Sequence, residues 1–340
     1  MPKTIVLITG ANGEIGRSLL ETFAREGDYD AVTLDLTPLP DAMRPLVTAS
    51  YAGNIMDRYL LDQLAAHHEI DLVFHLAALL STRGERDPEL AHQVNVEGTL
   101  NVLRMAQNQS SRLGRPVRFL FPSSIAVYGL PSLEEKHRVG RVREEQWNLP
   151  ITMYGCNKLY CEHLGRYLTF NARQLGALSG AARLDFRALR LPGLISAETV
   201  PTGGTSDFGP EMIHAAARGA PYKCFVEPEA RIPFMAMPDA VRALMGIARA
   251  DRERLSTCVY NVGAFNPSAG EIAARVRRAF PDARIDYEPD LVRARIVASW
   301  PEAVDDARAR SDWGWQPQYS WDRTFDEYLV PSIRARYARA

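Results

Sequence analysis

Tyr154 and Lys158 stand four positions apart in Tyr154-Gly-Cys-Asn-Lys158, within a segment whose apolar spacing predicts a helix. Side chains four apart share a helix face, so the lysine ammonium is expected beside the phenol. A free tyrosine has a pKa of about 10, and a base near pH 7 requires a shift of roughly 3 units, or about 4 kcal/mol. A neighbouring positive charge acts in that direction. The alternative interpretation is an ordinary solvated pair.

Ser124 is the third candidate. It lies in Phe121-Pro-Ser-Ser-Ile-Ala-Val-Tyr-Gly129, at the end of a predicted strand. The carboxyl end of that strand is expected to face the same crevice as the helix that carries Tyr154 and Lys158. The serine hydroxyl is therefore expected to hold a substrate oxygen while Tyr154 moves its proton.

A glycine-rich turn precedes these residues in the chain. Gly10, Gly13 and Gly16 join the predicted strand Thr4–Thr9 to the predicted helix Glu14–Glu26. Glycines there let the backbone approach a pyrophosphate, which then lies at the helix N-terminus. Asp35 follows Gly16 by 19 residues, where a carboxylate binds ribose hydroxyls and repels a 2′-phosphate. The spacing predicts NAD rather than NADP as cofactor.

The elements that position these residues alternate between strand and helix up to about residue 128, which predicts an α/β fold with a Rossmann-type doubly wound parallel sheet. Residues 1–185 are expected to form the NAD-binding domain, which also carries the three candidate catalytic residues. Residues 186–340 are expected to form mainly a smaller α+β substrate-binding lobe, with some segments returning to the main sheet. Residues 129–150 show no sustained periodicity and are interpreted as a loop over the site, and residues 88–108 as one helix.

Composition excludes several partners. The 340 residues carry a formal net charge of −1, so no basic field draws the chain to nucleic acid or an anionic membrane. The four cysteines form no CxxC pair and lack histidines at metal-ligand spacing, so no metal site and no disulfide framework are expected. The start of the chain shows no apolar signal region, which predicts a cytoplasmic protein. Lysines number only four, so a lysine at position 158 is less easily attributed to chance.

Together, the G-x-x-G-x-x-G turn, Tyr154-x-x-x-Lys158 and Ser124 resemble the extended short-chain dehydrogenase/reductase superfamily, in its NAD-dependent epimerase/dehydratase family. His75-Leu-Ala-Ala78 and Asn95-Val-Glu-Gly-Thr99 resemble further motifs of that superfamily, with Asn95 supporting the site and His75 packing rather than acting as a base. The resemblance favours Ser124 over Ser123, four residues before Tyr128. It implies these cofactor-binding residues: Gly10, Asn12, Gly13, Glu14, Ile15, Gly16, Asp35, Asn54, Ile55, Leu76, Ala77, Ala78, Asn95, Tyr154 and Lys158.

Four further stretches are similar to the short-chain type of L-threonine 3-dehydrogenases: Leu79-Leu-Ser81, the segment from Arg190 to Asp207 with its Gly-Gly-Thr-x-Asp sequence, Arg231-Ile-Pro-Phe-Met235, and the region from Ser299-Trp-Pro301 to Asp312-Trp-Gly-Trp315. This resemblance implies NAD-dependent oxidation of the β-hydroxyl of L-threonine or a related small β-hydroxy acid. The implied substrate-binding residues are Ser81, Ser124, Tyr154, Thr205, Arg231 and Trp300. Residues 171–182 are longer than the corresponding connection in those enzymes, and residues 129–150 align poorly with them.

Two other functions stay open. A nucleotide-sugar epimerase or dehydratase uses the same catalytic set, and Arg231 lies where such enzymes often bind a diphosphate. A non-catalytic NAD-sensing protein is the third hypothesis, although it predicts an eroded catalytic set. The superfamily commonly dimerises through the helices that correspond to residues 88–108 and 153–170, so a homodimer is expected by that analogy.

Overall fold

A seven-stranded parallel sheet forms the centre of the molecule, in the order β11-β7-β5-β4-β1-β2-β3. The computed structural model describes residues 3–171, 184–201 and 203–338, so the segment 171–182 lies outside the described residues except for its first position. The strands are β1 (Thr4–Thr9), β2 (Tyr29–Asp35), β3 (Ala49–Ala52), β4 (Leu72–His75), β5 (Arg118–Ser124), β7 (Asp185–Leu191) and β11 (Val259–Asn261). The predicted doubly wound α/β fold is confirmed.

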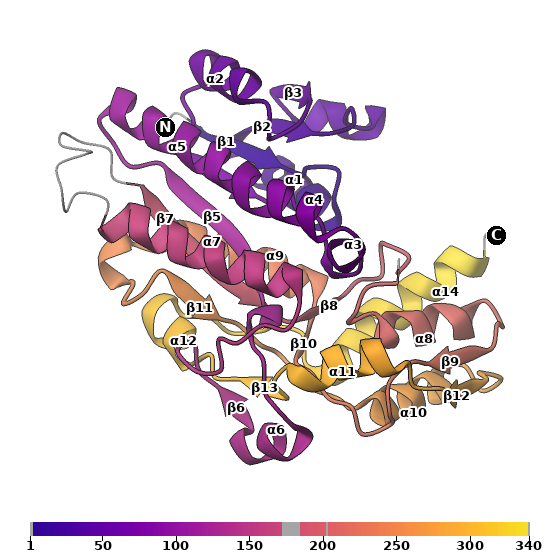
Figure 1. Cartoon of the computed structure of the whole chain (residues 1–340). Helices are drawn as coiled ribbons and strands as arrows, with labels where there is room; N and C mark the ends of the chain where they lie inside the picture. The colour runs from indigo at the N-terminus through magenta and orange to yellow at the C-terminus, as the bar shows by residue number, and fades with distance from the viewer. Residues whose placement is uncertain (1–2, 172–183, 202, 339–340) are drawn as a thin grey trace.

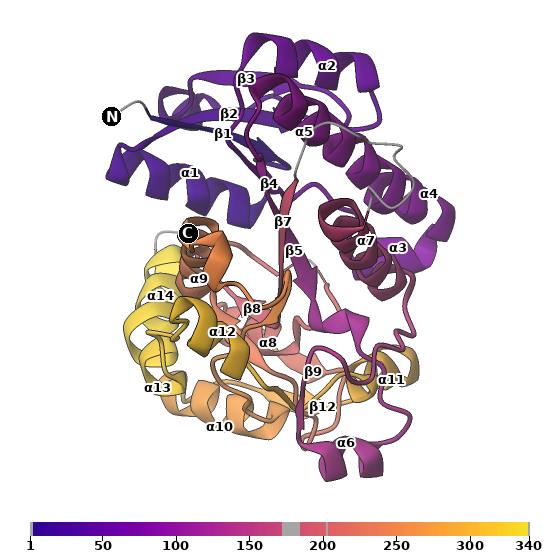
Figure 2. The same cartoon turned by 90° about the vertical axis from the view of Figure 1, so that its left-hand side faces the viewer.

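Helices cover both faces of this sheet, as Figure 2 shows with the strands between two helical layers. One layer contains α1 (Glu14–Glu26) and α9 (Met237–Arg249), and the other α2 (Arg58–His67), α5 (Thr99–Leu113) and α7 (Met153–Phe170). Each layer closes an apolar core, which explains why strands such as β1 read as continuous hydrophobic runs. The carboxyl ends of all seven strands therefore share one edge, where ligands bind in such sheets.

The helix expected over residues 88–108 is interrupted. The chain forms α3 (Ser81–Arg86), α4 (Pro88–His92), a π-helical turn (Gln93–Gly98) and only then α5, which ends at Leu113 before Gly114 in a left-handed conformation. A π-turn inserts one residue into the helical repeat and is common at functional sites. The apolar pattern on either side is unaffected, so the sequence alone did not reveal the turn.

The C-terminal half builds a smaller lobe beside the sheet edge (Figure 1). Its helices α8 (Phe208–Ala217), α10 (Ala269–Ala279), α11 (Leu291–Ser299) and α14 (Val330–Ala338) enclose an apolar core together with two short parallel strand pairs. The pairs are β8 (Gly193–Ile195) with β10 (Phe234–Ala236), and β9 (Tyr222–Cys224) with β12 (Ile285–Tyr287). Strand β11 comes from this half and joins the main sheet. Among the described helices, none is long and apolar enough to cross a bilayer.

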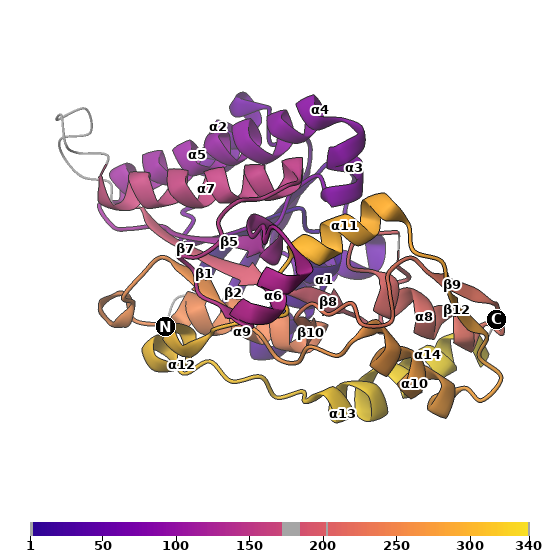
Figure 3. The same ribbon diagram turned by 60° about the horizontal axis from the view of Figure 1, so that its bottom comes forward.

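Residues 129–150 do not form the loop over the site that their polarity suggested. They contain α6 (Leu133–Val139) and β6 (Arg141–Val142), which pairs with β13 (Ala303–Val304). Figure 3 shows α6 beside α11, and Figure 1 shows it below the main sheet. The buried anchors Leu130 and Val142 join the lobe core, but they are too few and too widely spaced to give a period in the sequence.

Candidate active site

A cleft of about 810 Å³ lies at the carboxyl edge of the sheet, between the sheet and the lobe. Its volume is within the usual range for ligand sites. It is lined by most of the residues singled out from the sequence: Gly10, Gly13, Glu14, Ile15, Gly16, Asp35, Asn54, Ile55, Leu76, Ala77, Ala78, Ser81, Ser124, Tyr154, Lys158, Thr205 and Trp300. Asn12, Asn95 and Arg231 do not line it.

The glycine turn forms one wall of this cleft, and its geometry admits no side chains at two positions. Gly10 has φ +74°, and a Cβ there would lie 2.6 Å from the backbone nitrogen of Ala77. A Cβ at Gly16 would lie 2.5 Å from the carbonyl oxygen of Ala11. Helix α1 starts after Gly13 without a side-chain cap, so its first N–H groups remain available to the two phosphates of a dinucleotide.

Asp35 ends β2 beside this turn. Its Oδ2 accepts the backbone N–H of Asn12 at 2.9 Å, and its Oδ1 accepts that of Thr37 at 3.2 Å. The Thr37 hydroxyl also donates to Oδ1 at 3.4 Å, so Oδ2 keeps the free acceptor capacity for a ribose hydroxyl. Asn12 has a supporting position, because its side-chain amide donates to the carbonyl oxygen of Thr37 at 2.9 Å. The turn and the carboxylate therefore fit an adenosine diphosphate moiety with a free 2′-hydroxyl.

Replacing Asp35 with asparagine is expected to weaken NAD binding by about tenfold or more, because a hydrogen bond to a charged acceptor contributes about 1.5–3 kcal/mol. Discrimination against NADP should fall as well, since the charge that repels its extra phosphate is lost. Titration calorimetry with both dinucleotides measures the effect. Asp30→Asn, at the opposite end of the same strand, is the control and should bind NAD as the parent protein does. Unchanged NAD affinity in Asp35→Asn would contradict the assignment.

Ser124, Tyr154 and Lys158 come together where α7 meets the end of β5. Gly155 makes this possible, because a Cβ there would lie 2.1 Å from the carbonyl oxygen of Ala126, so only glycine lets the first turn of α7 approach this closely. The Lys158 Nζ donates to the carbonyl oxygen of Pro122 at 2.7 Å and lies 5.6 Å from the centre of the Tyr154 ring. All three side chains line the cleft.

Burial dominates the electrostatics of this group. It raises the pKa of Tyr154 to about 12, against the effect of a side-chain hydrogen bond with Ser124. It lowers the pKa of Lys158 to about 8, while Cys161 and Glu162 act in the opposite direction. The i,i+4 spacing carries no information about this loss of hydration, and the lowered pKa of Tyr154 that was expected for the working site stays a prediction. Activating the phenol requires positive charge beside it, and Lys158 is the chain's own source.

Two residues stand behind the cleft wall. Asn95, in the π-turn, accepts the backbone N–H of Leu79 at 2.7 Å and donates to its carbonyl oxygen at 3.0 Å. It therefore fixes the segment after β4 and supports the site without lining it. His75 is fully buried, with Nδ1 2.7 Å from the Thr9 hydroxyl and Nε2 2.9 Å from the Thr99 hydroxyl. The packing role expected for His75 is confirmed.

His75 makes stability depend on pH. Burial lowers its pKa to about 3, with a smaller contribution from the charge of Lys158, whereas an unfolded histidine has a pKa near 6.5. Between these two pKa values, the unfolded chain binds one proton more than the folded chain. The contribution of His75 to the free energy of unfolding is therefore fully present above about pH 6.5, and it falls by about 1.4 kcal/mol per pH unit below that value. Urea unfolding at pH 7 and pH 5 should show about 2 kcal/mol more loss in the parent protein than in His75→Gln. Equal losses would contradict this account.

The lobe closes the substrate end of the cleft. The Thr205 hydroxyl donates to the Ser81 hydroxyl at 3.0 Å, and the Thr82 hydroxyl donates to the carbonyl oxygen of Gly203 at 3.0 Å. Trp300 lines the cleft and also belongs to the lobe core, so it encloses the site and joins it to the lobe. The space beside Ser124 and Tyr154 is therefore bounded by hydroxyls and an indole ring.

Arg231 lies outside this cleft. Its backbone forms an isolated bridge with Ser268, and both terminal nitrogens of its guanidinium donate to Glu271 at 2.8 Å. It lines a separate surface groove with Phe265 and Trp321, so the expected role for Arg231 at the substrate is not supported by this arrangement.

Other cleft residues were not foreseen, namely Arg83, Ser196, Thr199 and Met237. Thr199 donates from its hydroxyl to Glu14 at 2.6 Å and so links the lobe to the first turn of α1. Ser196 and Thr199 lie within the segment from Arg190 to Asp207 that was singled out from the sequence, whereas Arg83 and Met237 belong to no motif, so no local signal identifies those two. Glu162, which acts on Lys158, was detectable as the next i+4 position on the same helix face.

A dinucleotide cleft beside a Ser/Tyr/Lys group, on a doubly wound parallel sheet, defines the class of NAD-linked dehydrogenases and epimerases. The comparison with known families agrees: the chain belongs to the NAD dependent epimerase/dehydratase family, which it matches over residues 6–263. Its cofactor is NAD.

The names of individual relatives are more specific than the name of the family. The bovine (Bos taurus) protein named "L-threonine 3-dehydrogenase, mitochondrial" is 32% identical over 314 residues, covering 92% of this chain and 79% of that protein. The holo form of a GalE-like L-threonine dehydrogenase from Cupriavidus necator has 34% identity and a TM-score of 0.81, with 98% of this chain and 99% of that chain covered. A monomeric L-threonine 3-dehydrogenase from a metagenome database has 31% identity and a TM-score of 0.83, with the same coverage.

Proposed function

We propose that this protein is an NAD-dependent dehydrogenase that oxidises the β-hydroxyl of L-threonine, or of a closely related small β-hydroxy amino acid, to the 3-oxo product. The observation that supports the proposal is that Ser81, Thr205 and Trp300 line the same cleft as Ser124 and Tyr154, with the Thr205 hydroxyl donating to that of Ser81. The names of the relatives point to the same substrate.

In the proposed reaction, Ser124 holds the substrate hydroxyl and Tyr154, as phenolate, accepts its proton. The C–H electron pair leaves the same carbon as hydride, so a C=O bond replaces the C–OH and atoms and charge balance. Bound NAD supplies the hydride acceptor. Lys158 has two roles: its ammonium favours the phenolate, and its position at the base of the cleft suits it to hold the nicotinamide ribose. For L-threonine the product is 2-amino-3-oxobutanoate.

The substrate carboxylate is small enough to be bound by the glycine-rich segment around Thr205. Backbone N–H groups and a hydroxyl in such a segment bind anions without a basic side chain. Arg231, the residue expected to bind the diphosphate of a nucleotide sugar, is engaged with Glu271 outside the cleft, which leaves Arg83 as the arginine that lines it. This makes the epimerase or dehydratase alternative the weaker one. An NAD-sensing protein gives no reason for Ser124, Tyr154 and Lys158 to converge.

The deciding experiment is a spectrophotometric assay of NADH formation with L-threonine, L-serine, L-allo-threonine and other β-hydroxy acids. Turnover with L-threonine at least tenfold above that with the others supports the proposal. The same preparation is tested for epimerisation of UDP-glucose. Absence of NADH formation from every β-hydroxy acid would refute the substrate assignment, and sugar epimerisation would replace it with the rival function.

Assembly and location are proposed with the function. We propose a homodimer through α4, α5 and α7, because α7 exposes Tyr160, Tyr167 and Phe170 on its outer face. One relative is described as monomeric, so light scattering on the purified protein is the test. A cytoplasmic location is proposed from the sequence, while the bovine relative is named as mitochondrial, and cell fractionation distinguishes the two.

A further inference from the structure

An ion pair that plays no part in the proposed reaction is buried behind the catalytic group. Glu162 and Arg190 are each 3% exposed, and the guanidinium binds the carboxylate through two bonds, Nε to Oε1 at 2.9 Å and a terminal nitrogen to Oε2 at 2.6 Å. Glu162 lies on α7 one turn beyond Lys158, and Arg190 lies on β7. Because desolvation offsets much of the attraction in such a pair, stability alone is a weak reason for its presence.

The pair joins the three elements that build the site. The Ser123 hydroxyl donates to Glu162 Oε1 at 2.5 Å, which ties the end of β5 to α7. Ser123 and Arg190 are also partners in the sheet register, as are Ser124 and Leu191. The Glu162 carboxylate thus contacts Ser123, the residue next to Ser124, and the Arg190 guanidinium on the neighbouring strand. Glu162 itself lies on α7, one helical turn beyond Lys158.

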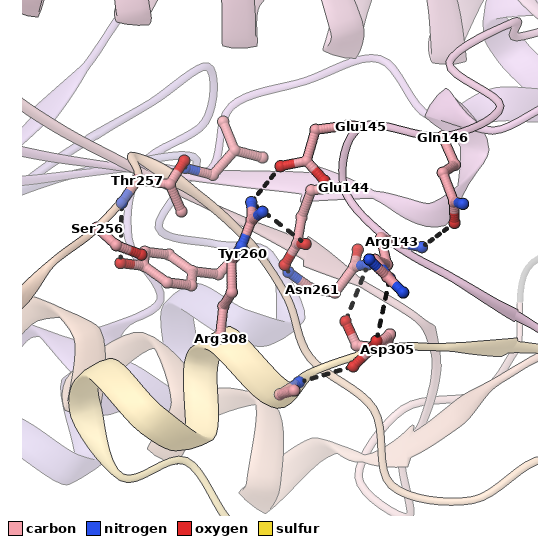
Figure 4. Close-up of polar contacts among 12 residues, drawn as sticks. Arg143, Glu144, Glu145, Gln146, Ser256, Thr257, Tyr260, Asn261, Asp305 and Arg308 are labelled. Atoms are coloured by element: carbon pink, nitrogen blue, oxygen red, sulfur yellow. Dashed lines mark hydrogen bonds and ion pairs between the residues drawn. The ribbon is translucent and has the colours of Figure 1, made fainter.

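The outer end of the pair is anchored in the segment 129–150. Arg190 donates to the carbonyl oxygen of Glu144 at 2.8 Å, and its guanidinium lies 4.8 Å from the centre of the Tyr128 ring. Glu144 in turn accepts the backbone N–H of Asn261 at 2.9 Å. Figure 4 shows the Arg308 side chain reaching toward Glu144 and Glu145. These contacts hold the Arg190 guanidinium in one orientation.

The charges around Lys158 single out Glu162. In the described part of the chain, the titratable groups that act on or lie against Lys158 are Tyr154, Cys161 and Glu162 of α7 and His75 of β4, with Arg190 behind Glu162. Burial raises the pKa of Cys161 to about 11 and lowers that of His75 to about 3, so both are neutral near pH 7. Glu162 is therefore the carboxylate whose charge favours the ammonium form of Lys158 in this buried position.

We propose that Glu162 and Arg190 are positioning residues of the reaction: their buried pair locks the end of β5 to α7 and β7 and keeps a fixed negative charge one helical turn from Lys158, so that the ammonium stays protonated next to Tyr154. This inference rests on the proposed roles of Tyr154 and Lys158, but not on the identity of the substrate.

The test replaces both members by neutral side chains of similar size, Glu162→Gln with Arg190→Met, which leaves no unpaired buried charge. Without the carboxylate, Lys158 loses its proton at lower pH, and the Tyr154 phenolate then forms only at higher pH. We expect the phenolate midpoint of the NAD-saturated protein to rise by about one pH unit, which is a tenfold change in the proton-binding constant. The midpoint is read from the ultraviolet difference spectrum against Tyr154→Phe.

With L-threonine as substrate, kcat near pH 7 should fall about tenfold in this double variant and recover as the pH rises, while the KM for NAD changes less than twofold. The matched control is Asp185→Asn with Arg187→Met. This pair is also buried on β7 and bidentate, but it bonds to α9 carbonyl oxygens and does not line the cleft. This control variant should lose stability, while the pH dependence of its phenolate formation and that of its kcat should match those of the parent protein.

A phenolate midpoint within about 0.2 pH units of that of the parent protein, in a folded double variant that binds NAD, would overturn the proposal. So would an equal shift in the control, because it would mark a general effect of removing a buried pair. The titration needs no turnover, so it decides on the pair even if L-threonine is not oxidised. A failed substrate assay with a shifted midpoint refutes the proposed function alone.

Discussion

The Tyr154→Phe variant is expected to lose kcat for L-threonine by about a thousandfold while it still binds NAD. General acid–base groups contribute about 10²–10⁴-fold, and this hydroxyl is the proposed proton acceptor. Phenylalanine keeps the ring and its packing against the lobe core, so the variant should fold. NADH formation measures the loss, and calorimetry measures the remaining affinity for NAD.

Tyr59→Phe provides the control for that variant. Tyr59 lies on α2, is 74% exposed and does not line the cleft. Its replacement should change kcat less than about twofold, since exposed substitutions away from a site have small effects. Turnover by Tyr154→Phe above about a tenth of the parent rate would show that another group accepts the proton.

Replacing Lys158 with methionine is expected to lower kcat at least about a hundredfold and to move the rise of activity with pH to higher values. The sign follows from the charge: an ammonium favours the phenolate, so its removal leaves only the Ser124 hydrogen bond to oppose burial and keeps the pKa of Tyr154 high. The KM for NAD should also rise if Lys158 holds the nicotinamide ribose. Rates measured from about pH 6 to pH 10 test both parts.

Lys136→Met is a closely matched control for this change. Lys136 is also buried, donates to a backbone carbonyl oxygen (Val297, 3.2 Å) and has its pKa lowered to about 8 by burial, but it lies on α6 outside the cleft. Its removal should affect the free energy of unfolding and leave the pH dependence of kcat unchanged. A pH profile of Lys158→Met that coincides with that of the parent protein would remove Lys158 from the activation of the tyrosine.

Much of the cofactor half was predictable because its signals are local. The glycine turn, Asp35 and the Tyr/Lys spacing each depend on a few consecutive residues, and the structure gathers them in one cleft. The strands of the main sheet were predictable for a related reason: a strand covered on both faces reads as a continuous apolar run. The π-turn at Asn95 was not predictable, because one inserted residue leaves the flanking helical pattern unchanged.

The substrate half was less predictable. Arg231 was expected at the substrate, yet its partner Glu271 is 40 residues away and holds it in another groove. The segment 129–150 was expected over the site, yet β6 pairs with β13 from the far end of the chain. Both errors concern contacts between distant segments, which no local period or motif encodes.

By itself, the sequence determined the class of this protein: an α/β fold, an NAD site, and a tyrosine and a lysine on one helix face. These depend on backbone conformation and on residues within one helical turn or one strand-to-helix junction. Only the tertiary structure decided the protonation energetics and the shape of the substrate end. Loss of hydration raises the pKa of Tyr154, while Arg190 reaches Glu162, and Trp300 the cleft, from elements far from α7 in the chain. Burial and long-range contacts are properties of the folded chain, so they appear only once its elements pack.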